Sequence, residues 1–300
     1  MPPARPPWPT VWWSAAPLYR VRRPSLPTRW PHSFVSYVTS SDPARARVVV
    51  LGCGTSTGVP VIGCTCAVCT SSDPRNRRLR SSIWIRSADA GILVDAGPDF
   101  RTQALTQRID RVDAVFFTHT HADHVHGMDD LRMFNFLQRR SIACYADEYA
   151  EANLRDRFAY IFNPRKDYPS TLPQLQLHRL DGSVSVGNIA VQPLPIWHGR
   201  EPIMGYRFGD FAYMTDVSAI PDATWPLLEG VRTILIDGLR FSPHPTHMSV
   251  DEAVAVGERL GVERLWLTHM SHQIDIQTAH QFLPDWARPA WDGLRIALNP

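Results

Sequence analysis

Apolar runs of strand length recur along the chain from residue 47 onward and predict most of its elements. Residues 48–51 form one run that ends at the glycine turn of Gly52 and Gly54, and residues 82–85 and 91–95 predict a hairpin. Five further runs predict strands, and a sixth is expected to be the last strand of the chain: 114–117, 189–196, 203–208, 211–215, 233–236 and finally 265–267.

Helices are predicted between some of these strands. One should follow Pro98, a residue that suits the first turn of a helix, and another should cover residues 128–138. A third should run from Ser249 to Arg259, with Ser249 as its N-cap and two acids in its first turn. Residues 163–174 are rich in proline and polar side chains and predict a loop. Successive strands with interspersed helices predict an α+β fold of two sheets with helices outside.

Residues 1–45 differ from the rest of the chain. Residues 1–41 contain no Asp or Glu and combine many prolines with tryptophan and arginine. No helical or strand period runs through them, and they lack the continuous apolar stretch of a secretory signal. We therefore expect residues 1–45 to be a disordered tail and residues 46–300 to form one domain. Two alternatives stay open: upstream sequence from a wrong start site, and a transit peptide, although the proline density argues against an amphipathic helix.

The overall composition limits the classes of partner. The chain has 300 residues, 44% of them hydrophobic, which is enough to bury a large core. Its net charge of +2 is too small to indicate a nucleic-acid groove. No apolar run approaches the roughly 18 residues of a membrane-spanning helix. We expect a soluble protein with a small-molecule substrate and no membrane partner, and a homodimer is one further expectation.

The stretch from Thr118 to His124 carries the densest candidate chemistry. It places four metal-capable side chains directly after the apolar run of residues 114–117: His119, His121, Asp123 and His124. In an extended segment the first two histidines project to one face, while the last two residues can aim at a second point. Imidazole and carboxylate suit zinc, iron or manganese. Two pairs of ligands predict two metals, and a histidine-rich surface loop is the alternative.

Three later residues also follow apolar strands. His198 follows residues 189–197, Asp216 follows residues 211–215, and His269 follows residues 265–268. The end of a buried strand is a place where a rigid element can hold a ligand. A single polar residue at a strand end is more often a turn former, but their order after the first cluster favours metal ligands.

In this order the seven residues resemble the five metal-binding motifs of the metallo-β-lactamase superfamily: His119, His121, Asp123, His124, His198, Asp216 and His269. The resemblance covers nearly all of the chain after the tail. That family folds as an αββα sandwich with its metals at one edge of the two sheets, so the resemblance implies this fold here. It also implies that His119, His121 and His198 hold one divalent metal, zinc or manganese. Asp123, His124 and His269 would then hold the other, with Asp216 bridging both.

A second metal site is predicted around Cys64, Cys66 and Cys69. Three of the five cysteines lie within residues 64–69, a spacing that is awkward for disulfides. With His272 as fourth ligand they predict a closed, tetrahedral structural zinc site, although His272 could equally support another ligand. Metal ligation favours a reducing compartment, and we therefore expect a cytoplasmic protein. The other two cysteines read as small buried residues.

The run from Leu51 to Pro60, followed by the cysteine triplet, resembles the phosphoribosyl 1,2-cyclic phosphate phosphodiesterases of phosphonate breakdown. The resemblance implies hydrolysis of a small cyclic phosphate by a metal-bridged hydroxide, with Asp123 among the catalytic residues. His247 precedes the predicted helix at Ser249 and resembles the proton-donor histidine of ribonuclease Z and related diesterases. A free imidazole pKa of about 6.5 suits that role. His244 is the reserve candidate, and a helix-capping role for His247 is the alternative.

Other functions remain open. A ribonuclease Z-like RNA endonuclease would need a long flexible arm, and the sequence has no basic, glycine-rich insertion of that kind, so nucleic acid is an unexpected partner. A carrier resembling the pyrroloquinoline-quinone biosynthesis protein would share the cysteine triplet but need not keep every ligand. Substrate contacts cannot be assigned. Arg78 and Arg80 could meet a phosphate, but a solvated charge run is the better interpretation of their loop. Asp95 is expected to hold the second nitrogen of a ligand histidine.

Overall fold

The computed structural model describes residues 46–165 and 170–299. The predicted tail, residues 1–45, lies outside the described residues. The strands are β1 (Arg47–Gly52), β2 (Ser82–Arg86), β3 (Gly91–Val94), β4 (Ala114–Phe116), β5 (Ile142–Ala146), β6 (Leu175–Arg179), β7 (Val184–Val186), β8 (Ile189–His198), β9 (Glu201–Phe208), β10 (Phe211–Met214), β11 (Thr233–Asp237), β12 (Arg264–Thr268), β13 (Ala287–Pro289) and β14 (Arg295–Ala297). The α-helices are α1 (Phe100–Gln107), α2 (Ala122–Val125), α3 (Arg132–Gln138), α4 (Glu148–Arg157), α5 (Ala159–Phe162) and α6 (Val250–Leu260).

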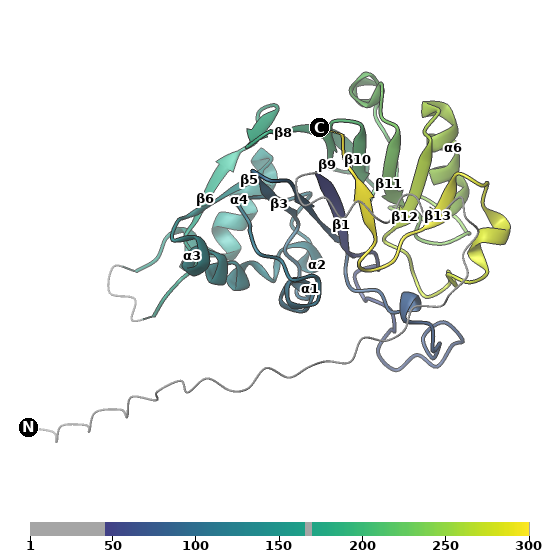
Figure 1. The fold of residues 1–300 in the computed structure, drawn as a ribbon, viewed down its shortest axis with the longest axis horizontal. Helices are drawn as coiled ribbons and strands as arrows, with labels where there is room; N and C mark the ends of the chain where they lie inside the picture. The colour runs from purple at the N-terminus through teal and green to yellow at the C-terminus, as the bar shows by residue number, and fades with distance from the viewer. Residues whose placement is uncertain (1–45, 166–169, 300) are drawn as a thin grey trace, which may run out of the picture.

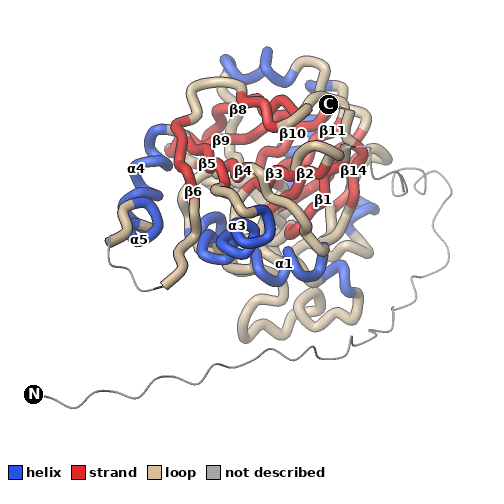
Figure 2. The backbone as a smooth tube through the Cα atoms, turned by 60° about the vertical axis from the view of Figure 1, so that its left-hand side comes forward, coloured by secondary structure: helices blue, strands red, loops and turns tan. Residues whose placement is uncertain are grey.

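The strands form two sheets of seven strands each, in the orders β14-β1-β2-β3-β4-β5-β6 and β13-β12-β11-β10-β9-β8-β7. Figure 1 shows α6 against the outer side of the second sheet, and α1, α3 and α4 on the side of the first. Figure 2 shows α1 and α3 as neighbours on that side. The αββα sandwich that the sequence implied is therefore confirmed.

Strands β1 to β4 of the first sheet are buried on both faces, which explains their apolar runs. In β1, Val48 and Val50 face the core between the two sheets, whereas Val49 and Leu51 face the helices outside. Because successive side chains of a strand point to opposite faces, one apolar run supplies two cores. No helix among the described residues is long and apolar enough to cross a membrane.

Several predicted elements differ in detail from the structure. The prediction that residues 265–267 are the last strand is wrong, because β13 and β14 follow and β14 pairs antiparallel with β1. The predicted helix over residues 128–138 is split into a 3-10 helix, Met128–Leu131, and α3. Pro98 precedes the N-cap, Asp99, rather than lying in the first turn of α1. The predicted hairpin is confirmed as β2 and β3.

The predicted N-cap at Ser249 is confirmed, and its loss should be measurable. Ser249 Oγ accepts from the amide of Glu252 at 3.3 Å, and the Glu252 carboxylate accepts from the amide of Ser249 at 2.7 Å. We expect Ser249→Ala to lower the free energy of unfolding by about 1 kcal/mol, measured by urea denaturation. Ser185→Ala, at an exposed serine of β7, is the control. Equal stability of the two variants would contradict a stabilising cap.

Candidate functional site

The candidate ligands converge because strands of both sheets end at one edge. In the first sheet β3 and β4 run parallel, and in the second sheet β10, β11 and β12 run parallel. The carboxyl ends of parallel strands meet at the same edge of a sheet. The last residue of β8 and the segments that follow β4, β10 and β12 supply the seven residues predicted as ligands: His119, His121, Asp123, His124, His198, Asp216 and His269.

The structure brings these residues into the groups that the sequence predicted. Ligand atoms of His119, His121 and His198 lie within 4.8 Å of one another, and so do those of Asp123, His124 and His269. Asp216 lies between the groups, with Oδ2 3.3 Å from His124 Nε2 and Oδ1 3.2 Å from His269 Nε2. The Asp216 carboxylate is therefore close to the second group. Its ligand atom also lies within 4.8 Å of those of His119 and His124.

In His124 and His198, a hydrogen bond to Nδ1 leaves Nε2 for a ligand. His124 Nδ1 donates to Asp95 Oδ2 at 2.7 Å, and His198 Nδ1 donates to the carbonyl of Thr246 at 2.8 Å. Asp95 also accepts from the amide and the hydroxyl of Thr118, each at 2.8 Å. These contacts orient the imidazoles before any ion is bound. The expected contact between Asp95 and a ligand histidine is thus present.

The unpaired atoms of this cluster fit a pair of cations. His124 Nε2 and His269 Nε2 are buried and form no hydrogen bond of good geometry among the described residues, although the Asp216 carboxylate lies 3.3 and 3.2 Å from them. Buried nitrogens without partners are costly unless an ion or another group satisfies them. Although burial opposes the charge, Asp216 and Asp95 raise the pKa of His124 well above its usual value. The acids of the cluster therefore already favour positive charge at this place, and the donor set suits zinc or manganese.

Backbone strain also concentrates at the site. Asp95, Asp216 and His269 have φ angles of 63°, 56° and 51°, in the left-handed region that ordinary residues rarely adopt. Each such residue costs about 1–3 kcal/mol and persists only where its surroundings hold it. Close packing of the loops helps: a Cβ at Gly97 would lie 1.9 Å from the carbonyl oxygen of Asp123, so only glycine allows this approach.

His247 stands beside the cluster with a carboxylate of its own. Its Nδ1 donates to Asp237 Oδ2 at 2.7 Å, and Asp237 is fully buried. The ring stacks on His269, with centroids 4.7 Å apart and planes at 11°, and meets His198 edge-on at 4.8 Å. Asp237 was missed by the sequence analysis. It ends β11 as Asp216 follows β10, so the same strand-end signal could have found it.

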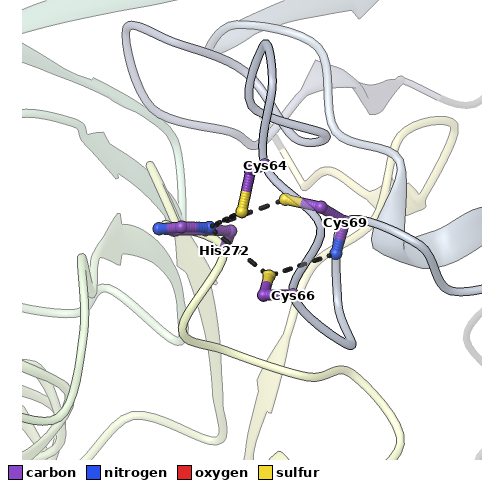
Figure 3. Close-up of side chains that lie close together, drawn as sticks. All are labelled: Cys64, Cys66, Cys69 and His272. Carbon is purple, nitrogen blue, oxygen red and sulfur yellow. Dashed lines mark hydrogen bonds between the residues drawn. The ribbon is translucent and has the colours of Figure 1, made fainter.

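The cysteine cluster is a second place where ligand atoms converge (Figure 3). His272 Nδ1 lies 3.3 Å from Cys64 Sγ and 3.5 Å from both Cys66 Sγ and Cys69 Sγ. Zinc bonds of ordinary length at tetrahedral angles place N and S about 3.5 Å apart. The amide of Cys69 donates to Cys66 Sγ and lowers the pKa of that thiol to about 6, which favours the thiolate. The four residues therefore fit one zinc ion.

Comparisons with known proteins agree with this geometry. A family model described as a beta-lactamase superfamily domain matches residues 91–270. The chain belongs to the beta-lactamase superfamily. Within this superfamily it is similar to a solved structure, a new diphosphatase from the PhnP family. The two share 40% identity and a TM-score of 0.78 over 85% of this chain and 99% of that chain.

Two more distant structures share the superfamily fold, and at their low identities the likeness shows the fold alone. Zn(2+)-bound PqqB from Methylobacterium extorquens is 19% identical, with a TM-score of 0.67 over 84% of this chain and 100% of that chain. Human tRNase Z, short form, is 17% identical, with a TM-score of 0.58 over 85% of this chain and 100% of that chain.

A curated relative is named octanoyltransferase, from Porphyromonas gingivalis (strain ATCC BAA-308 / W83). It is 40% identical over 259 residues, which are 84% of this chain and 52% of that protein. The chain thus spans about half the length of the curated relative it matches, and the relative's name describes the longer protein.

The surroundings of the site differ from the sequence-based expectation at Arg78. Arg78, expected in a solvated charge run or on a phosphate, is 1% exposed and can meet neither solvent nor substrate. Arg80 pairs with Asp99 at 3.0 Å. Cys53 and Cys144 are buried, as expected. His244 is partly buried, and its Nδ1 lies 3.2 Å from the Thr246 hydroxyl rather than beside a carboxylate.

Proposed function

We propose that this chain is a metal-dependent hydrolase that cleaves a P–O bond in a small phosphodiester, with a ribose-type cyclic phosphate as the leading substrate. The observation that carries the proposal is the pair formed by His247 and Asp237 next to the seven convergent ligand residues. One ring nitrogen of His247 lies within 4.8 Å of ligand atoms of His198 and Asp216. Hydrolysis of a diester needs neutralisation of the phosphoryl charge and a proton for the leaving group. Cations at the ligand residues would supply the first, and His247 would supply the second.

Two divalent cations, zinc or manganese, would be held by the two groups of three ligands, with Asp216 contacting both. Bound there, the cations would supply Lewis-acid neutralisation of the phosphoryl oxygens and a water of lowered pKa. The chain's own residues hold this arrangement: Asp95 orients His124, and the carbonyl of Thr246 orients His198. Asp123 would be a ligand in the group with His124 and His269, and its carboxylate would offset part of the positive charge of the cations. The cysteine site would hold a third, structural zinc.

The chain's contribution to proton transfer centres on His247. Its Nδ1–H is held by Asp237, so Nε2 is the atom left to carry the transferred proton. Burial, followed by the charge of His269, lowers the pKa of His247 to about 4 in the chain alone. The proton therefore has to be stabilised by the negative charge of the substrate, which opposes that shift. A phosphodiester monoanion beside the ring meets this requirement.

A second candidate substrate class is a diphosphate. The 40% identical structure is named a diphosphatase, and a P–O–P bond differs from a diester chiefly in its leaving group. Phosphate leaves as a weak base and needs little help from an acid, whereas a ribose alkoxide is strongly basic. The well-formed pair of His247 and Asp237 favours the alkoxide and so the diester. A carrier would not need this pair, whereas an RNA endonuclease could use it, so a substrate panel is needed to separate RNA from small diesters.

The proposal is tested by metal removal and reconstitution. We expect chelator-treated protein to lose hydrolysis of bis(p-nitrophenyl) phosphate and to regain it with zinc or manganese. Elemental analysis should find two readily exchanged cations and one tightly held zinc. The reconstituted protein is then assayed on ribose cyclic phosphates, linear diesters, diphosphates and precursor transfer RNA. Full turnover by protein shown to be free of metal would reject the metal-dependent mechanism, and preference for diphosphates would favour the second candidate.

A further inference from the structure

Arg78 is the largest fully buried side chain among the described residues, and it is a charged one. No described carboxylate lies within ion-pair distance of its guanidinium, and arginine is rarely buried without such a partner. An unpaired charge in a core is costly, so its hydrogen bonds must offset a large desolvation penalty. Those hydrogen bonds show which segments of the chain Arg78 joins.

The guanidinium joins two segments that are far apart in the sequence. Nη1 donates to the carbonyl of Ser271 at 3.0 Å, and Nη2 donates to the carbonyl of Ile274 at 2.5 Å and to Asn76 Oδ1 at 3.0 Å. Asn76 is itself 1% exposed. It accepts from the amide of Ile276 at 3.1 Å and donates to the carboxylate of Asp275 at 3.0 Å. Arg78 and Asn76, here called the clamp, therefore fasten residues 271–276 to the loop before β2.

The clamped segment starts two residues after a strained candidate ligand. His269 has a φ angle of 51°, a left-handed conformation that is strained and is kept only if its neighbours are held. On its C-terminal side the amide of Met270 donates to the carbonyl of Cys53 at 2.9 Å, and the clamp holds the residues after it. The same segment carries His272 of the cysteine cluster. The clamp and the cysteine cluster therefore both hold this segment.

We infer that Arg78, together with Asn76, is a positioning residue that sets His269 for metal binding, and that it does so independently of zinc at the cysteine cluster. The inference rests on the proposed function only in that the His/Asp cluster binds metal. Arginine is required because its planar fork reaches several carbonyl oxygens at once, whereas a lysine ammonium is a single point. Among the described residues the Arg78 guanidinium donates to Ser271, Ile274 and Asn76, and none of these belongs to the ligand group of His119, His121 and His198.

The test measures metal binding at each group separately. Metal-free protein is titrated with Co²⁺, following its absorption spectrum and the heat of binding. We expect Arg78→Met to weaken one of the two equivalents at the His/Asp cluster by about 10- to 100-fold and to leave the other unchanged. His269→Ala should weaken the same equivalent, and the double variant should show little further loss. General destabilisation of the fold would weaken both equivalents alike.

Matched variants separate the clamp from its surroundings. Arg80→Met, in the same loop but paired with Asp99, should bind both equivalents normally. Cys66→Ser, which removes a ligand of the structural zinc, should also leave both equivalents at the His/Asp cluster in place. Arg78→Lys and Asn76→Ala are milder changes that retain part of the clamp. They should weaken the same equivalent by less, and they keep the test decisive if Arg78→Met does not fold.

The outcomes distinguish the inference from the function on which it rests. A wild-type protein that binds no divalent cation at the His/Asp cluster rejects the proposed function. A wild-type protein that binds two, beside clamp variants that bind two with unchanged or equally reduced affinities, rejects the positioning role alone. A loss in Cys66→Ser equal to that in Arg78→Met assigns the positioning of His269 to the structural zinc and likewise rejects it.

Discussion

Asp216→Ala is expected to lower kcat/KM for bis(p-nitrophenyl) phosphate by about 10³-fold, with metals supplied in excess. Asp216 is 3% exposed, and its carboxylate lies 3.3 Å from His124 Nε2 and 3.2 Å from His269 Nε2 of the second group. It also lies within 4.8 Å of a ligand atom of His119, which belongs to the first group. Removing it deletes a negative charge that both cations would share. Metal ions contribute several kcal/mol of charge stabilisation in such sites, and about 4 kcal/mol corresponds to that factor.

The control for this prediction is Asp181→Ala, at an exposed aspartate between β6 and β7. It should hydrolyse the ester like the wild type. Asp216→Asn keeps the size and one oxygen but loses the charge, so it should resemble Asp216→Ala more than the wild type. Metal content is measured on each protein, because loss of a cation is the expected cause. Unimpaired turnover in Asp216→Ala would discard a mechanism with two cooperating cations.

His247→Ala is expected to depress hydrolysis of diesters with alkoxide leaving groups by about 10²- to 10⁴-fold, the range of general acid catalysis. Hydrolysis of bis(p-nitrophenyl) phosphate should change far less, because p-nitrophenolate is a weak base and leaves without a proton. Asp237→Asn should also lower hydrolysis of the alkoxide esters much more than that of bis(p-nitrophenyl) phosphate, because the amide no longer stabilises a protonated His247. The measurement is the ratio of kcat values on the two kinds of ester.

His244→Ala serves as the matched control for His247. The two rings lie 5.1 Å apart, but only His247 has a buried carboxylate partner among the described residues. We expect His244→Ala to keep the wild-type ratio between the two ester types. Equal losses on both esters in His247→Ala would remove it as the proton donor, and a selective loss in His244→Ala would transfer the role to that residue.

The candidate site could be predicted largely because its signal is local. Each of the residues His198, Asp216 and His269 comes directly after an apolar run, and the histidine cluster directly follows β4. Parallel strands end at one edge, so polar residues at strand ends are brought together by the fold itself. The same reasoning succeeds for the N-cap Ser249, whose partner Glu252 is three residues away.

Tertiary structure alone decided the contacts between distant segments. The backbone carbonyls that Arg78 binds, those of Ser271 and Ile274, are almost 200 positions away. The distances of His272 from the three cysteines could not be read from its place after His269. β14 likewise pairs with β1 from the opposite end of the chain. Local patterns report periodicity, caps and strand ends, but which buried charge meets which carbonyl depends on how the elements pack. The amino-acid sequence by itself predicted the superfamily, the candidate ligand residues and most strands, and packing decided which residues contact the segment after His269.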